Sequence, residues 1–258
     1  MDTTDHHVET PGGRLFTRSW GAAAPAPAIL LFHDSLGCVD LWRDFPARLA
    51  AATTLRVVAY DRLGFGRSDA HPGPIGPDFI REEARTAVPA LSEALGLGPL
   101  VLLGHSVGGA MAVATAASHG GLCQGVITIA SQAFVEDRTL QGILEAKAAF
   151  AEPGQMERLA RYHGDKARFV LEAWTQTWLS PDFADWSQDE DLGRLSCPLL
   201  ALHGDRDEYG SLAHPQRIVA RAGGPARAVT LADCGHVPHR EKPELVIAEL
   251  IGFLRGLA

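Results

Sequence analysis

Short, continuous runs of apolar residues alternate along the first half of the chain with longer segments in which apolar residues recur every three or four positions. A continuous run is typical of a strand buried on both faces of a sheet, and the recurring pattern is typical of a helix with one buried side. Strands that alternate with helices form βαβ units, so the pattern predicts an α/β fold with a mostly parallel central sheet and helices on both faces. The predicted strands are residues 28–32, 55–60, 100–103 and 126–130, and the predicted helices are residues 40–52, 78–95 and 106–118.

The alternation is interrupted in the middle of the chain. Residues 132–195 contain helical, aromatic and charged segments but no convincing buried strand. The strand pattern returns at residues 197–203 and 227–231, and an amphipathic terminal helix is expected at residues 243–257. We therefore expect a core built from both ends of the chain and an inserted helical cap. The expected core is residues 1–131 and 196–258, and the expected cap is residues 132–195.

The N-terminal segment shows a different pattern. Residues 8–20 consist of two short stretches around the turn sequence Pro11-Gly12-Gly13, an arrangement that is typical of a β-hairpin. Residues 21–27 are rich in alanine and proline, and we expect them to form a linker into the first buried strand.

Composition and charge exclude several classes of partner. Of the 258 residues, 46% are hydrophobic and 21% are charged, as in a soluble globular protein with a sizeable core. The 23 basic and 31 acidic residues give a formal net charge of −8, whereas a nucleic-acid-binding protein presents a basic face. No apolar run approaches the roughly 20 residues that span a bilayer, and the N-terminal residues lack the basic and apolar regions of a secretory signal. We therefore expect a cytoplasmic protein that acts on a small molecule and binds neither nucleic acid nor membrane.

Cysteines and glycine-rich segments give no sign of a metal or cofactor. The cysteines at 38, 123, 197 and 234 are scattered, with no CxxC pair and no metal-type spacing, so we expect free, buried thiols in a reducing compartment. Gly64 and Gly66 lack the third glycine and the helix start that a nucleotide-binding loop requires. The sequence therefore predicts no cofactor and no metal.

The sequence Gly104-His105-Ser106-Val107-Gly108 fits the pattern G-x-S-x-G. It follows the apolar strand PLVLLG and begins a helix of small residues, AMAVATAA. A strand that turns sharply into a helix exposes the serine hydroxyl, and the free N–H groups at the helix start suit a developing oxyanion. Ser106 is therefore the candidate nucleophile; the alternative is a serine that caps an ordinary turn between strand and helix.

A serine hydroxyl becomes a good nucleophile only when a base removes its proton. His236 is the best candidate base, because it follows a predicted strand and precedes the last helix, and His239 is the second choice. The base in turn needs a carboxylate to orient it. The segment after the strand at residues 197–203 offers Asp205 and Asp207, and the residues alone do not choose between them.

Five stretches carry a further signal: FHDSLG at residues 32–37, YDRLGFGRSD at 60–69, GHSVGG at 104–109, HGDRDEYG at 203–210 and CGHVPHREKPE at 234–244. With them the chain resembles the α/β-hydrolase superfamily over nearly its whole length. The resemblance implies a capped, carboxylesterase-like serine hydrolase with the catalytic order Ser106, Asp207, His236. In that family the acid is typically the third residue after the glycine that ends the strand, which is Asp207 counted from Gly204, and Asp205 is then a turn residue.

The resemblance also implies an oxyanion hole made by two backbone N–H groups. One belongs to Val107, directly after the candidate nucleophile. The other lies in a loop that often reads His-Gly-x-x-Gly in the family and reads HDSLG at residues 33–37 here, so Ser35 is the expected donor. Asp34 replaces the usual glycine. Because a carboxylate beside an oxyanion would oppose catalysis, we expect Asp34 to be turned away or paired with an arginine such as Arg62.

The cap is expected to close over the serine with helices at residues 140–151 and 167–178. Large aromatic residues are frequent in it, and some are expected to line an apolar pocket for the acyl or alcohol part of a substrate. The pocket candidates are Phe134, Trp174 and Trp178; the alternative is that these side chains only anchor the cap to the core.

The expected reaction is hydrolysis of a small-to-medium carboxylic ester through an acyl-enzyme on Ser106. The same triad could instead cleave a thioester, a lactone, an amide or a carbon–carbon bond. A different alternative is a non-catalytic protein that binds a ligand on this fold, since a fold alone does not imply catalysis. The complete set of serine, histidine and aspartate favours the enzyme.

Overall fold

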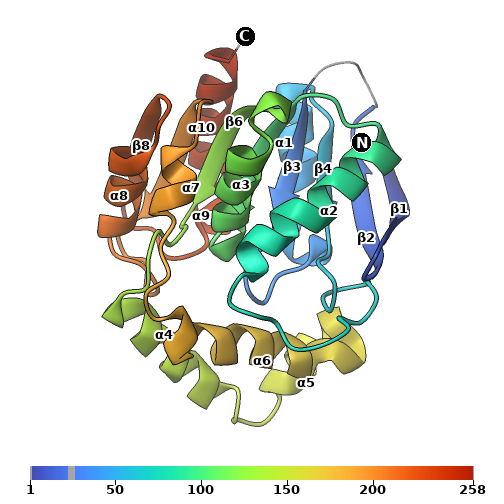
Figure 1. The fold of residues 1–258 in the computed structure, drawn as a ribbon, viewed down its shortest axis with the longest axis vertical. Helices are drawn as coiled ribbons and strands as arrows, with labels where there is room; N and C mark the ends of the chain where they lie inside the picture. The colour runs from blue at the N-terminus through green and yellow to red at the C-terminus, as the bar shows by residue number, and fades with distance from the viewer. Residues whose placement is uncertain (1, 23–26, 258) are drawn as a thin grey trace.

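The apolar runs of the sequence form the centre of one sheet in the computed structural model, which describes residues 2–22 and 27–257. The strands of these ranges are β1 (Thr3–Thr10), β2 (Gly13–Trp20), β3 (Ala28–Phe32), β4 (Val57–Tyr60), β5 (Leu100–His105), β6 (Cys123–Ile129), β7 (Leu199–Gly204) and β8 (Ala226–Leu231). They lie in the order β1-β2-β4-β3-β5-β6-β7-β8 (Figure 1). β1 pairs antiparallel with β2, β2 pairs antiparallel with β4, and the other neighbouring strands are parallel.

Helices cover both faces of this sheet. They are α1 (Phe45–Thr53), α2 (Phe79–Leu95), α3 (Val107–Ser118), α4 (Asp137–Ala149), α5 (Gln155–His163), α6 (Ala167–Trp178), α7 (Asp189–Gly193), α8 (Ala213–Arg221), α9 (Pro238–Glu241) and α10 (Pro243–Arg255). One layer contains α2, α3, α7 and α8, and the opposite layer contains α1 and α10 (Figure 1). Of the helices in the described ranges, none is both long enough and apolar enough to cross a bilayer.

Alternate residues of the central strands point to opposite faces of the sheet, and both faces are buried. In β5, Leu102 packs into the apolar core under α2 and α3, whereas its neighbour Leu103 packs into the core under α1 and α10. Both leucines have an exposed fraction of 0%. A strand with two buried faces needs apolar residues at every position, which is why the sequence shows a continuous run here.

The helices α4, α5 and α6 lie together across one end of the sheet (Figure 1). This is the end at which β5 terminates, because Ile143 of α4 and Trp174 of α6 line the same cavity as Ser106. The short helix α7 contacts α3 and α8 instead and belongs to the layer on the sheet. The last part of the segment that the sequence assigns to the cap therefore packs on the core, and the domain division at residues 132–195 stays a prediction.

The predicted fold class is confirmed: the sheet is mostly parallel and has helices on both faces. The predicted hairpin at residues 8–20 is present as β1 and β2, with β1 beginning earlier, at Thr3. The four cysteines are free and buried, as expected. In the predicted linker at residues 21–27, positions 23–26 lie outside the described residues.

The predicted helix at residues 40–52 begins later than expected. Val39–Trp42 forms a 3₁₀ turn, and Arg43 follows with a φ of 58°, in the left-handed region of backbone space. A non-glycine residue with this φ cannot continue a right-handed helix, so α1 begins only at Phe45.

The central strand provides a test of the core. We expect Leu102→Ala to lower the free energy of unfolding by about 2–5 kcal/mol, because it leaves a cavity in a fully buried position. Leu144→Ala is the matched control: Leu144 is 50% exposed, and its truncation should change stability by less than about 0.5 kcal/mol. Urea unfolding of both variants measures the difference. Equal losses would contradict the placement of β5 at the centre of the core.

Candidate active site

Ser106 occupies the sharp turn between β5 and α3. β5 ends at His105 and α3 begins at Val107, so a single residue makes the connection. Its φ is 55° and its ψ is −127°, a combination that strains any residue with a Cβ. The Ser106 N–H donates to the carbonyl of Ile129 at 2.9 Å, which ties the turn to the neighbouring strand β6.

Two glycines allow the turn to pack against the sheet. A Cβ on Gly104 would lie 2.0 Å from the carbonyl oxygen of Gly108, and a Cβ on Gly108 would lie 2.1 Å from the carbonyl oxygen of Phe32. Both contacts are with backbone atoms, which cannot move aside as a flexible side chain can. The glycines of the G-x-S-x-G pattern are therefore required by close backbone approach, as well as by the shape of the turn itself.

The three candidate catalytic side chains meet at this turn. His236 Nε2 accepts a hydrogen bond from Ser106 Oγ at 3.0 Å. On the other side of the same imidazole, Nδ1–H donates to both carboxylate oxygens of Asp207 at 2.9 Å. The three residues come from positions separated by up to 130 residues in the chain and form one continuous hydrogen-bonded row.

Asp207 is fixed by its surroundings. It lies in the loop after β7 with an exposed fraction of 1%, and its Oδ1 accepts the N–H groups of Tyr209 and Gly210 at 2.8 and 3.1 Å. The other open candidate, Asp205, is exposed and accepts the N–H of Cys234 at 3.3 Å. The structure therefore brings Asp207 to His236 and leaves Asp205 in a turn.

The charges of the row stabilise one another. Burial alone would raise the pKa of Asp207, but the hydrogen bond from His236 and the charge of that imidazole hold it below its ordinary value. Burial alone would lower the pKa of His236, but the hydrogen bond to Asp207 and the charge of that carboxylate raise it. His236 is therefore a stronger base than a free imidazole and still has its Nε2 directed at Ser106.

The second-choice base, His239, lies elsewhere. It is 4% exposed and packs against Trp42, with ring centroids 4.8 Å apart. Burial holds the pKa of His239 well below its ordinary value, so the ring is neutral. Its place is in the apolar layer behind the site.

The loop that carries His236 is held by two carboxylates. Glu241 accepts the N–H of Gly235 at 2.7 Å with one oxygen and the N–H of Val237 at 3.0 Å with the other. Glu208 accepts the N–H of His236 itself at 3.3 Å. Neither glutamate is among the residues predicted from the sequence; the available signal is that Glu208 directly follows Asp207 and that Glu241 lies five positions after His236.

The loop after β3 lies against Ser106. Asp34, Ser35 and Leu36 line the same cavity as Ser106 and His236. The N–H of Leu36 donates to Asp34 Oδ1 at 3.0 Å, and the N–H of Gly37 donates to the Asp34 carbonyl at 3.2 Å. The N–H groups of Leu36 and Gly37 are therefore already hydrogen-bonded. Of residues 35–37, only Ser35 has an N–H group without such a bond within this loop.

The expected pairing of the Asp34 carboxylate with Arg62 is wrong. Arg62 Nη2 donates to the backbone carbonyl of Asp34 at 2.9 Å, and His33 Nδ1–H donates to the same carbonyl at 2.8 Å. The carboxylate oxygen Oδ2 instead accepts a hydrogen bond from Nδ1–H of His105 at 3.1 Å. The reason is the register of the sheet: Phe32 lies opposite Gly104, so the residues that follow β3 reach the end of β5.

The cavity in front of Ser106 has a volume of about 280 Å³. Another cavity, of about 330 Å³ beside α2, includes none of the three candidate catalytic residues in its lining, so chemistry rather than size identifies the site. Ser106, His236 and two carboxylates line one part of the smaller cavity, and α4 and α6 contribute mainly apolar side chains together with Thr139. Its lining is Asp34, Ser35, Leu36, Ser106, Gln132, Thr139, Ile143, Trp174, Trp178, Glu208, Tyr209, His236 and Val237.

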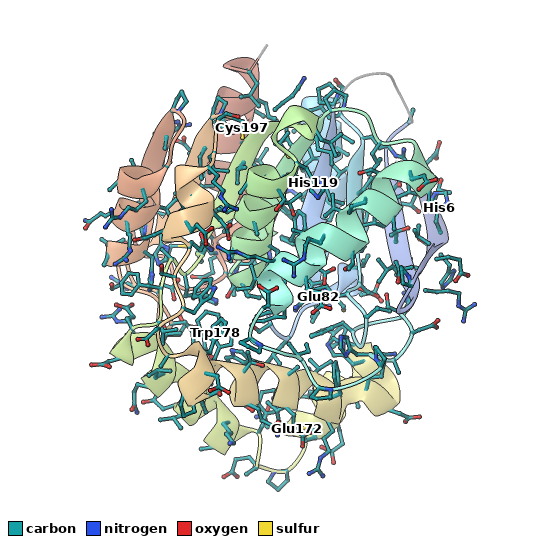
Figure 2. The ribbon with its side chains drawn as sticks, viewed as in Figure 1. His6, Glu82, His119, Glu172, Trp178 and Cys197 are labelled. Atoms are coloured by element: carbon teal, nitrogen blue, oxygen red, sulfur yellow. The ribbon has the colours of Figure 1, made fainter. Side chains whose placement is uncertain are left out.

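The structure brings two of the three pocket candidates to this cavity. Trp174 and Trp178 come from α6, and Figure 2 shows Trp178 where that helix meets the core. Phe134 is not in the lining. It packs against His214, with ring centroids 4.6 Å apart, and lies under the guanidinium of Arg217 at 4.9 Å. Phe134 lies between the end of β6 at Ile129 and the start of α4 at Asp137, so its side chain is held on the core although the sequence assigns it to the cap.

The arrangement can support transfer of an acyl group. A hydroxyl is hydrogen-bonded to a base, the base is oriented by a buried carboxylate, and the N–H of Val107, the first residue of α3, has no partner within the helix. In residues 2–22 and 27–257, no group of three histidine, cysteine, aspartate or glutamate side chains is arranged to hold a metal ion.

The chain is similar to known proteins in both sequence and fold. The profile of the alpha/beta hydrolase family matches residues 29–249. The chain is 30% identical to human monoglyceride lipase over 146 residues, which are 55% of this chain and 48% of that protein. It is 36% identical to human (lyso)-N-acylphosphatidylethanolamine lipase over 84 residues, which are 33% of this chain and 24% of that protein.

The chain thus matches less than half the length of each of these curated relatives. Among solved structures, a membrane phospholipase A that is a bacterial virulence factor shares the fold, with a TM-score of 0.81 and 21% identity over 99% of this chain and 86% of that one. The family profile covers most of the sequence. The chain belongs to the alpha/beta hydrolase family.

Proposed function

We propose that the protein is a serine hydrolase that cleaves a small-to-medium carboxylic ester through an acyl-enzyme on Ser106. The proposal is carried by one observation, the unbroken hydrogen-bonded row from Ser106 Oγ through His236 to Asp207 at the wall of a cavity. Both curated relatives described above are named lipases, which favours an ester bond as the target.

In the proposed first step, Ser106 Oγ attacks the ester carbonyl while His236 Nε2 takes the hydroxyl proton. Asp207 stabilises the imidazolium that forms and keeps the proton of Nδ1 directed away from the serine. His236 then gives the proton to the leaving alcohol. In the second step a water molecule, deprotonated by the same Nε2, releases the acid and restores the serine.

The negative charge of the tetrahedral intermediate requires donors that are in place before it forms. We assign this role to the N–H groups of Val107 and Ser35. Val107 is the first residue of α3, where the N–H has no helical partner and the helix dipole favours negative charge. Ser35 is supported by elimination within its loop, because the N–H groups of Leu36 and Gly37 are bound to Asp34.

The size of the cavity bears on the substrate. Its volume of about 280 Å³ lies just below the range for small-molecule pockets, roughly 300–1,000 Å³. Trp174 and Trp178 give one wall an apolar, aromatic surface. A short acyl chain or a compact alcohol fits this space, whereas a long chain would have to extend past the cap.

Replacement of the nucleophile is the first test. Ser106→Ala should lower kcat by about 10⁶-fold, because no other hydroxyl is hydrogen-bonded to His236 Nε2 in the described residues. A fluorophosphonate probe should label the wild-type protein and fail to label the variant. Ser118→Ala, at the opposite end of α3, is the control and should retain both labelling and turnover. Undiminished ester hydrolysis by Ser106→Ala would overturn the proposal, and an unlabelled wild type would favour a non-catalytic binder.

The pH dependence tests the base and its orienting acid. Only neutral His236 can accept the proton, and its pKa is raised, so kcat/KM should rise with pH through a midpoint above the ordinary imidazole value of about 6.5. Asp207→Asn should lower kcat by about 10⁴-fold, because an amide no longer fixes the useful tautomer. Asp205→Asn, two residues away and exposed, is the matched control and should leave the profile unchanged. A flat profile from pH 5 to 9 would rule out His236 as the base.

The cap wall tests the substrate pocket. With p-nitrophenyl esters of increasing acyl length, the wild type should prefer short chains, and Trp174→Ala should move the optimum to longer ones because it removes one wall of the cavity. Trp186→Ala is the control, since Trp186 stacks on Phe183 at 5.2 Å and does not line this cavity. An unchanged preference in Trp174→Ala would exclude that residue from the acyl pocket.

A further inference from the structure

A second carboxylate–histidine pair lies directly behind the proposed triad. Asp34 Oδ2 accepts a hydrogen bond from His105 Nδ1–H at 3.1 Å. On its other side, His105 Nε2–H donates to the backbone carbonyl of His236 at 2.7 Å. His105 is 1% exposed, and its ring centroid lies 5.1 Å from that of His236. The mechanism described above uses neither Asp34 nor His105.

The two hydrogen bonds define the protonation of His105. Both of its ring nitrogens face oxygen atoms that can only accept, a carboxylate on one side and an amide carbonyl on the other. A neutral imidazole has a single N–H and could satisfy only one of them. The geometry therefore requires the imidazolium form, and Asp34 is its counter-ion.

This pairing also explains how a carboxylate is tolerated in the loop of the proposed oxyanion hole. Burial alone would raise the pKa of Asp34, but the hydrogen bond and the charge of His105 hold it well below its ordinary value, so Asp34 is ionised. Its second oxygen accepts the N–H of Leu36. Gly37 leaves room for the carboxylate, because a Cβ there would lie 2.7 Å from Asp34 Oδ1.

With the hydrogen bond from His105, the backbone groups on both sides of His236 have partners. The N–H groups of residues 235–237 are held by Glu208 and Glu241. The carbonyl of His236 accepts a hydrogen bond from His105 at the end of β5. His105 in turn donates to Asp34 in the loop after the neighbouring strand β3. The peptide planes on both sides of His236 are thus fixed, and with them the position of its Cβ, from which the hydrogen bond to Asp207 orients the imidazole.

We propose that Asp34 and His105 form an ion pair that positions His236: the hydrogen bond from His105 orients the backbone of the base, and the imidazolium offsets the negative charge that Asp34 places beside it. This inference rests on the proposed function only where catalysis is measured. His105 and Asp34 are positioning residues in it and take no part in bond making.

Other titratable groups also face His236 and bear on the test. Asp207 and Glu208 are carboxylates that raise its pKa. The pKa of Tyr209 is raised by burial, and burial lowers the pKa values of His203 and His239, so these three groups are neutral near pH 7. Asp34 and His105 are therefore the charges near His236 that the variants below alter.

The first variant removes the imidazolium. His105→Ala should lower kcat by about 10–100-fold with KM changed less than about threefold, because a misplaced base slows the chemical step more than binding. It also leaves the Asp34 carboxylate uncompensated. That negative charge favours protonated His236, so the pKa of His236, followed by NMR of its ring nitrogens, should rise, and the rising limb of kcat against pH should move to higher pH.

The second variant separates charge from position. In the double variant His105→Ala with Asp34→Asn, the uncompensated charge is gone, so the pKa of His236 should return towards the wild-type value. The loss in kcat should remain, because the carbonyl of His236 is still without its donor. A residue that acted only by filling space in the core would give a loss without this reversible change in pKa.

The control is a histidine that also donates to a backbone carbonyl but does not contact His236. His119 donates to the carbonyl of Ala84 at 3.1 Å and directly follows α3, at the opposite end of that helix from Ser106 (Figure 2). His119→Ala should leave kcat and the pKa of His236 unchanged. Thermal unfolding of every variant shows whether it is folded at the assay temperature; if His105→Ala is not, His105→Gln, which keeps a donor to the carbonyl without the charge, should show the pKa change alone.

Two results would overturn the inference: an unchanged pKa of His236 in folded His105→Ala, or a raised pKa that Asp34→Asn fails to reverse. The NMR measurement needs no turnover, so it decides the matter even if the wild type hydrolyses no ester. An inactive, unlabelled wild type would instead overturn the proposed function. The two failures are therefore distinguishable.

Discussion

The backbone at Ser106 is the constraint on which the site depends. A hydroxyl at the end of a buried strand reaches a cavity only if the chain turns within one residue, and this requires the positive φ that Ser106 adopts. Such a conformation costs about 1–3 kcal/mol and persists only where the surroundings enforce it. Here they do so through the N–H of Ser106 on β6 and the close approach of Gly104 and Gly108 to neighbouring backbone.

Because Ser106 is fixed, the base must be brought to it with similar accuracy. His236 lies on a loop without regular structure, and such a loop would be mobile if its backbone groups were free. Carboxylates on its N–H groups and an imidazolium on its carbonyl replace the hydrogen bonds that a strand or helix would supply. The same groups set the charge around the base, so position and proton affinity are determined together.

The sequence was sufficient for the features that depend on local pattern. Continuous apolar runs identified the buried strands, and the glycines around Ser106 marked the turn because only glycine permits the close backbone contacts. It was insufficient where the outcome depends on which strands are neighbours. Asp34 is expected from the sequence to be turned away or paired with an arginine such as Arg62, but β3 lies beside β5 in a register that places the residues after Phe32 next to His105.

Other misses have a similar origin. Helices α5 and α8 were not predicted, since each is short and mostly polar and buries only a few side chains. In α8, Pro215 also suggests an interruption, although proline is tolerated in the first turn of a helix. Phe134 was assigned to the pocket from its type and its place in the chain; only the path of the backbone after β6 shows that it packs on His214 instead.

Helix α4 contacts both the cavity in front of Ser106 and the loop that carries Asp207. In α4, Arg138 donates to the carbonyl of Asp207 at 3.0 Å and Thr139 donates to the carbonyl of Tyr209 at 2.7 Å, so this helix is bonded to the loop of the acid. The tryptophans of α6 contribute a wall of the cavity. The hydrogen bonds that fix Ser106, His236 and the Asp207 carboxylate come from core residues. A substitution in α6 should therefore change the size of the pocket with little effect on the hydrogen-bonded row. A change in α4 alters the pocket through Ile143 and the acid loop through its two hydrogen bonds, so substrate preference and rate are coupled there.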